Sequence, residues 1–123
     1  VSMHPWFSTA SGNYIYAINQ MLLQSKDDQI YIAPAVPDQW NDFSFRLACY
    51  GNIVTELVLD EGHIKKLVLK YGNPLGEVSR KVIIPERYID KKNINKDFSG
   101  SMALVNGNYH FDLNFKGQAV VID

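Results

Sequence analysis

From Gln29 onward, apolar and polar residues alternate along most of the chain, and this period of two limits what the chain can fold into. In FSFRLACY, residues 43–50, one face gathers the apolar side chains Phe43, Phe45, Leu47 and Cys49. Residues 109–115, YHFDLNF, repeat the pattern with Tyr109, Phe111, Leu113 and Phe115. Successive side chains of a strand point to opposite faces, so these segments predict strands with one buried and one solvated face.

Turn signals separate the alternating segments. The strongest are Gly51-Asn52, Asp60-Glu61-Gly62 and Asn106-Gly107-Asn108, residue types that suit tight hairpin turns. Around them the sequence predicts strands at 29–33, 43–50, 53–59, 63–70, 80–84, 101–105, 109–115 and 120–123, with 86–99 as a surface connection. Short strands at regular spacing are typical of two packed antiparallel sheets, so we expect a mainly β fold, a β-sandwich.

The start of the chain follows a different period. In residues 14–24, YIYAINQMLLQ, the side chains Tyr14, Ile18, Met21 and Leu22 share one helical face, which predicts one N-terminal α-helix before the sandwich. Residues 1–25 contain no Asp, Glu, Lys or Arg. An uncharged helix with apolar cover on several sides needs more neighbours than one β-domain supplies. We therefore expect 1–25 to be the lead-in and last helix of a missing part, and 26–123 to be the sandwich domain.

Composition excludes several partner classes. Twelve basic and thirteen acidic side chains leave a net charge of −1, and no basic stripe is present that could neutralise a phosphate backbone, so we expect no nucleic-acid partner. Polar residues interrupt 1–25 too often for a membrane span, which needs about 20 mostly apolar residues. The single cysteine, Cys49, lies in a strand pattern, where a buried inert thiol is expected rather than a nucleophile.

Catalytic motifs are missing from the sequence. His4, His63 and His110, with Cys49, lack ligand spacing, so we expect no metal and no cofactor. No nucleophile-elbow or phosphate-loop motif appears. The acidic pairs Asp27-Asp28 and Asp60-Glu61 are interpreted as solvated turn residues; the alternative is the acid/base pair of a glycosidase.

Aromatic residues leave two interpretations open. An exposed aromatic face can stack on a sugar ring, which makes Trp40 a sugar-stacking candidate. The alternative is that Trp40 and Tyr109 pack in the core, as large aromatic side chains commonly do. Trp6 lies in the irregular segment before the helix, where either role fits.

Two adjoining motifs carry a resemblance to a known enzyme group. MLLQS at 21–25, followed by a strand and by PAVPDQW at 34–40, resembles the C-terminal part of bacterial (α/α)6-barrel glycoside hydrolases, with FSFRLACYG at 43–51 in agreement. Glycoside hydrolase family 95, the α-L-fucosidases, is the most similar, and family 65, the disaccharide phosphorylases, is next. In both families the last barrel helix leads directly into a C-terminal β-sandwich.

The resemblance implies a role and a location. It implies a non-catalytic domain that packs against the catalytic barrel of the same polypeptide, in the periplasm or outside the cell, with oligosaccharide as a possible further partner. In the intact parent, the residues near the substrate would be His4, Trp6, Thr9, Ser11 and Asn13.

The sequence departs from family 95 at one catalytic position. That family carries an acid in a D-G-N-F-G motif just before this helix. The corresponding residue here is Thr9, or Ser11 if the Gly-Asn pair is matched, and neither is a carboxylate that could activate water. We expect no catalytic residue in this chain.

Two other functions remain as alternatives. One is a carbohydrate-binding module in which exposed tyrosines and Trp40 stack on a glycan. The other is a sandwich used for protein–protein contact, with the apolar helix docking on the partner.

Overall fold

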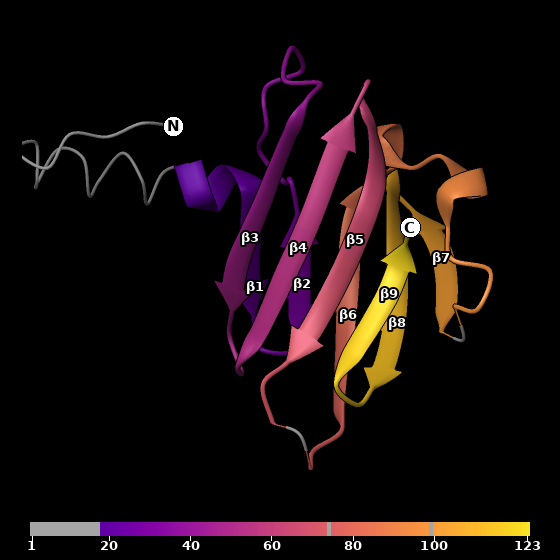
Figure 1. Cartoon of the computed structure of the whole chain (residues 1–123). Helices are drawn as coiled ribbons and strands as arrows, with labels where there is room; N and C mark the ends of the chain where they lie inside the picture. Colours follow the sequence, from indigo (N-terminus) through magenta and orange to yellow (C-terminus); the bar gives the residue numbers. More distant parts are fainter. Residues whose placement is uncertain (1–17, 74, 99) are drawn as a thin grey trace, which may run out of the picture.

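A computed structural model describes residues 18–73, 75–98 and 100–123 and folds them into two β-sheets packed face to face (Figure 1). Sheet A has the order β1-β2-β6-β8-β7 and sheet B the order β3-β4-β5-β9. The strands are β1 (Leu23–Lys26), β2 (Gln29–Ile32), β3 (Phe43–Cys49), β4 (Ile53–Asp60), β5 (His63–Tyr71), β6 (Val78–Pro85), β7 (Ser101–Val105), β8 (Asn108–Phe115) and β9 (Gln118–Ile122). A short α-helical segment at 18–22 precedes them. The predicted fold class, a β-sandwich after one N-terminal helix, is confirmed.

Neighbouring strands run antiparallel with one exception. Strand β2 pairs with β6 in parallel, with Ile30 opposite Val82. After β2 the chain crosses to sheet B, forms β3, β4 and β5 there, and returns to sheet A as β6. The sequence predicted only antiparallel pairing, because alternation within a strand carries no information about its distant neighbour.

The predicted hairpin turns are present. Glu61 and Gly62 join β4 to β5 with φ of 54° and 79°, and Asn106 and Gly107 join β7 to β8 with φ of 51° and 81°. Positive φ at both central residues is the geometry whose twist matches that of paired strands. Glycine adopts it without steric cost, which explains these two turn sequences.

The helix ends earlier than its apolar pattern predicts. Leu23 and Gln24 belong to β1, where they pair with Ile32 and Tyr31 of β2, so the predicted helix is wrong at these two positions. Pairing with β2 satisfies their backbone groups and buries Leu23, which outweighs local helix propensity. The boundary predicted between residues 25 and 26 therefore falls inside β1.

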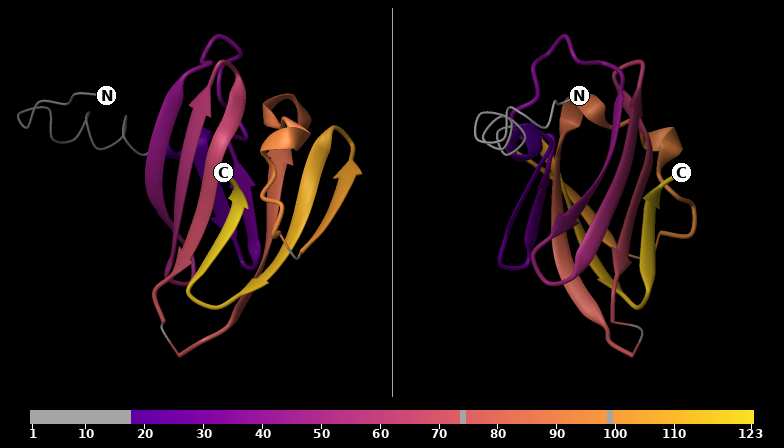
Figure 2. Two further views of the ribbon diagram at one scale, coloured as in Figure 1. Left: turned by 45° about the vertical axis from the view of Figure 1, so that its right-hand side comes forward. Right: turned by 60° about the vertical axis from the view of Figure 1, so that its left-hand side comes forward.

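The core lies between the two sheets (Figure 2). Strand β8 contributes Tyr109, Phe111, Leu113 and Phe115, the four side chains that the alternation assigned to one face, and all four are buried. The other fully buried side chains come from both sheets and include Ile30, Ile53, Leu57, Leu67, Leu69, Ile84 and Val121.

The connection between β6 and β7 covers one edge of sheet B. It contains two 3-10 turns, η2 (Glu86–Tyr88) and η3 (Lys91–Asn93). Beyond η3, the Asn95 amide donates to the Val121 carbonyl at 2.9 Å, and the Asp123 amide donates to the Asn93 carbonyl at 3.1 Å. The backbone groups on the outer side of β9 are thus partly satisfied by this segment.

Candidate functional site

All five predicted substrate-proximal residues precede the part of the chain that the structure describes. His4, Trp6, Thr9, Ser11 and Asn13 lie outside the described residues, as do Tyr14 and Ile15 of the predicted helix. Their roles remain predictions.

The described part of the helix is joined tightly to the sandwich. The Ala33 amide donates to the Leu22 carbonyl at 2.7 Å, and the Ala35 amide donates to the Met21 carbonyl at 3.3 Å. Leu22 is half-buried and packs against the core. Ala33 is buried with a φ of 48°, a left-handed conformation that residues with a Cβ rarely adopt. The chain therefore turns sharply where the helix, β1 and β2 meet.

The loop at 34–40, which carries the proline motif, is held by a residue from much later in the sequence. Arg87 of η2 forms an ion pair with Asp38 through Nη1 and donates to the Val36 carbonyl through Nη2 at 3.1 Å. Its Nη2 also donates to the Tyr88 hydroxyl at 2.6 Å. The Tyr88 contact, assisted by the Asp38 carboxylate, raises the pKa of Arg87 above its usual value. Arg87 acts as a clamp on this loop.

Trp40 lies at the end of the clamped loop in an intermediate environment. Its side chain is half-buried and packs against the hydrophobic core, and its amide donates to the Pro37 carbonyl at 3.0 Å. The indole is only partly buried, which is compatible both with packing against the core and with stacking on a sugar ring. The sugar-stacking role remains a prediction. Tyr109, by contrast, is buried as the core interpretation predicts.

The acidic pairs lie on exposed turns, and Asp28 also lines the cavity described below. The partner of Asp60 is Asp42, from the loop before β3, and not its neighbour in sequence Glu61. The hydrogen bond with Asp42 raises the pKa of Asp60, whereas the Glu61 amide, 2.9 Å from Asp42 Oδ1, lowers the pKa of Asp42. Sequence reasoning missed this pair, since Asp42 lies 18 positions before Asp60. The hydrogen bond from the Glu61 amide to Asp42 joins the hairpin turn to the loop before β3.

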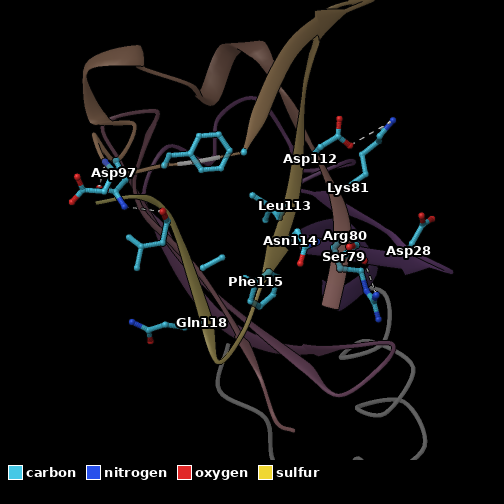
Figure 3. A pocket seen from close by; sticks show the side chains of 15 residues that line it. Asp28, Ser79, Arg80, Lys81, Asp97, Asp112, Leu113, Asn114, Phe115 and Gln118 are labelled. Carbon is cyan, nitrogen blue, oxygen red and sulfur yellow. Dashed lines mark hydrogen bonds and ion pairs between the residues drawn. The ribbon is translucent and has the colours of Figure 1, made fainter. Parts of the chain in front are cut away.

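A cavity of about 620 Å³ lies beside the C-terminal half of β8 (Figure 3). Strand β8 separates a polar side, with Lys81 and Asp112, from a side formed by β9 and the segment at 95–100. Lys81 Nζ lies 3.9 Å from Asp112 Oδ1, and the Ser101 hydroxyl donates to Asp112 Oδ2 at 3.1 Å.

Arg80 lines the cavity from the face of sheet A that it shares with Leu113. Its Nη1 donates to the Ser79 carbonyl at 2.8 Å, while its Nε is buried without a hydrogen-bond partner among the described residues. The amides of Asn114 and Gln118 also line the space. The lining thus combines charged side chains, uncharged amides and apolar side chains such as Phe115, a mixture that suits the binding of a polar molecule.

Cys49 has a structural role. Cys49 is buried, its Sγ lies 3.2 Å from Thr55 Oγ1, and burial raises the pKa of its thiol. A thiol that is harder to ionise is a poorer nucleophile, and the predicted burial of Cys49 is confirmed. Over 18–73, 75–98 and 100–123, no group of three or more His, Cys, Asp or Glu side chains is placed to hold a metal ion.

No helix in the described ranges is both long enough and apolar enough to cross a membrane. Compared with protein-family models and with curated proteins, the sequence matches none of them.

Proposed function

We propose that this chain is a non-catalytic β-sandwich domain of a carbohydrate-active enzyme, and that it packs against and supports a catalytic helical barrel of the same polypeptide. The observation that carries the proposal is the junction at 18–40. There a helix leads without a linker into β1, and the loop that follows β2 is fixed to the sandwich by Arg87.

The junction favours a rigid connection over a flexible one. Two backbone hydrogen bonds join Met21 and Leu22 to Ala35 and Ala33, and no Gly/Ser-rich spacer intervenes. A flexible linker would let two domains move independently. A helix bonded directly into the sheet fixes the direction in which the preceding chain leaves the sandwich, as a supporting domain requires.

The described acidic residues are consistent with a supporting role. Asp42 accepts a hydrogen bond from the Glu61 amide at an exposed hairpin, and Glu56 is surrounded by Arg46, Lys66 and Lys70. Glycosidases need two carboxyl groups about 5–9.5 Å apart on either side of a substrate bond. The described cavity is lined by three carboxylates, Asp28, Asp97 and Asp112, of which Asp112 is engaged by Lys81 and Ser101.

The coding sequence before Val1 tests the proposal. We expect it to encode a helical-barrel pattern with an inward-facing carboxylate pair, and a start codon directly before Val1 would overturn the proposal. We also expect no turnover of aryl glycosides by the 123-residue chain, and measurable turnover would contradict the non-catalytic role.

In the longer protein, Arg87→Ala tests the junction. We expect it to lower the melting temperature of the barrel, because the loop at 34–40 loses its clamp. Arg46→Ala removes an exposed arginine of β3 whose ion-pair partner is Glu56 of β4 and not a residue of that loop, and it serves as the matched control. Equal shifts for the two variants would contradict the junction argument.

A carbohydrate-binding module is the second candidate, and two observations favour it. Tyr50 is 69% exposed at the turn between β3 and β4, and the cavity beside β8 is lined by uncharged amides as well as ion pairs. Loss of glycan binding by Asn114→Ala would assign binding to the cavity, and loss by Trp40→Ala would assign it to the clamped loop. Binding of no glycan by the intact chain would remove this candidate.

A further inference from the structure

Strand β7 is an edge strand without the protection that the other edges of the molecule have. It ends sheet A, and no described residue pairs with its outer side. All five residues of β7 are exposed, and its sequence, SMALV, contains no charge and no proline. Natural proteins usually shield such edges with charges, prolines, bulges or a covering segment, since free backbone groups can pair with another strand.

The three other edges of the two sheets are shielded. Strand β1 has four residues and ends on the exposed Lys26. Strand β3 carries the exposed Arg46 at its middle. The outer side of β9 is covered by the segment at 93–95, through the Ile94–Ile122 bridge and two backbone hydrogen bonds. The exposed edge of β7 is therefore specific to this strand and not a general property of the fold.

The inward face of β7 is also uncovered. Met102 pairs with Phe111 and Leu104 with Tyr109, so both side chains point to the core side of sheet A. Their partners are 0% and 6% exposed, whereas Met102 is 41% and Leu104 50% exposed. Sheet B has four strands against the five of sheet A, and β7 extends beyond β9 (Figures 1 and 2).

We infer that β7 pairs with β7 of a second copy of this chain, antiparallel about a two-fold axis at Ala103. This register places Ser101 opposite Val105 and Met102 opposite Leu104. Both Met102–Leu104 pairs then lie on the core side, where each copy covers the apolar side chains that its own sheet B leaves exposed. The contact uses the same surface on both copies, as closed two-fold dimers do.

Charge placement supports a second copy as the occupant. The charged residue that pairs directly with β7 is Asp112, opposite Ser101 at one end of the strand. In the two-fold register, Ser101 meets Val105 of the second copy, whose neighbour on β8 is the uncharged Asn108. Like charges therefore do not meet across the axis.

The small area of the contact limits the expected affinity. A five-residue strand buries much less than the roughly 1,200–2,000 Å² of a standard stable interface, so the dimer should form at high micromolar concentration and dissociate on dilution. Sedimentation velocity of the 123-residue chain across this range should show a monomer–dimer equilibrium. A monomer at every concentration would overturn the inference.

Charge substitutions at the axis locate the interface. Ala103→Lys places two ammonium groups opposite each other, so dimerisation should weaken at least tenfold, and Ala103→Glu should do the same. Mixing the two variants should restore association as a heterodimer, since opposite charges then meet across the axis. Ala103 is exposed, so melting temperature and circular dichroism of the monomers should not change.

The control is Ala48→Lys, which adds the same charge to an exposed alanine of β3. It should leave the dimer intact. Dimerisation that survives Ala103→Lys, or that Ala48→Lys weakens equally, would place the contact elsewhere and overturn the inference. The proposal does not rest on the barrel-supporting role, and neither experiment depends on it.

Discussion

Strands β7 and β8 pair residue for residue over five positions, yet they differ completely in burial. In β8 the inward side chains are buried and the outward ones half-buried or exposed, whereas every residue of β7 is exposed. Both strands are rich in apolar residues, and Met102 and Leu104 point the same way as Phe111 and Tyr109.

The difference comes from the opposite sheet and not from the strands themselves. Strand β9 of sheet B covers the core side of β8, whereas no strand of sheet B lies opposite β7. An apolar side chain stabilises a sheet in proportion to the area that it removes from water. The same pattern of residues is therefore core in one strand and surface in the next.

The largest expected effect comes from truncating, in two separate variants, the two side chains of one cross-strand pair. Phe111→Ala should lower the free energy of unfolding by about 3–5 kcal/mol, because it leaves a cavity in the core. Met102→Ala should change it by about 0.5 kcal/mol or less, since the side chain is already in water. Urea unfolding of the two variants measures both values, and similar losses would contradict the described difference in burial.

The second test addresses the two glycines at the ends of β7. A Cβ at Gly100 would overlap the Asp112 carbonyl oxygen and the Phe98 ring, so Gly100→Ala should push β7 away from β8 and cost about 1–3 kcal/mol. Gly107 has open space around it but a φ of 81°, so Gly107→Ala should cost only about 1 kcal/mol, from backbone strain alone. Thermal unfolding would show the order, and a larger loss at Gly107 would contradict it.

A third, smaller effect depends on pH and contrasts β7 with the centre of sheet B. Hydrogen bonds from Lys70 and then Lys66 lower the pKa of Glu56 below its usual value of 4.5. A lowered pKa stabilises the fold above the unfolded-state value, and this contribution is lost as pH falls through the folded-state value. Glu56→Gln should therefore destabilise at neutral pH, and this effect should shrink as the pH falls below 4.5 and through the lowered folded-state pKa.

The matched variant for this test is Ala103→Ser, because β7 contains no titratable side chain. Its small effect on the free energy of unfolding should stay constant from neutral to acidic pH. A Glu56→Gln effect that is equally constant would show that the lysine contacts do not stabilise the carboxylate.

The smallest expected effect is that of Ser101→Ala on β7. The variant removes the hydroxyl that donates to Asp112 Oδ2 at 3.1 Å, but both residues are exposed and water replaces the bond. We expect a loss of about 0.5 kcal/mol or less. A loss above about 1 kcal/mol in chemical denaturation would show that β7 is held more firmly than its exposure indicates.

Local signals were sufficient to predict most of the fold. Alternation located strands β2 to β9 to within one or two residues but not β1, and the Asn106-Gly107 and Glu61-Gly62 sequences identified two turns through their backbone requirements. Features that depend on distant segments were not predictable. The parallel β2–β6 pair is one, and the strand conformation of Leu23 is another, since it is decided by β2 rather than by the apolar helix pattern.

The candidate site was predicted less completely for the same reason. Trp40 and the loop at 34–40 were recognised from their prolines, but Arg87, which holds the loop, lies 49 positions after its ion-pair partner Asp38 in an apparently ordinary charged connection. The uncovered edge of β7 was also hidden, because SMALV has the composition of a core strand.

The parallel contact between β2 and β6 has a consequence for the order in which the molecule is assembled. Strands β3, β4 and β5 can form from consecutive hairpins, whereas β2 must wait until β6, about fifty residues later, has been synthesised. During translation, the β1–β2 hairpin and the helix before it therefore remain without their sheet neighbour until the ribosome has passed residue 85. The β1–β2 hairpin and the helical segment at 18–22 therefore reach their final positions late in folding.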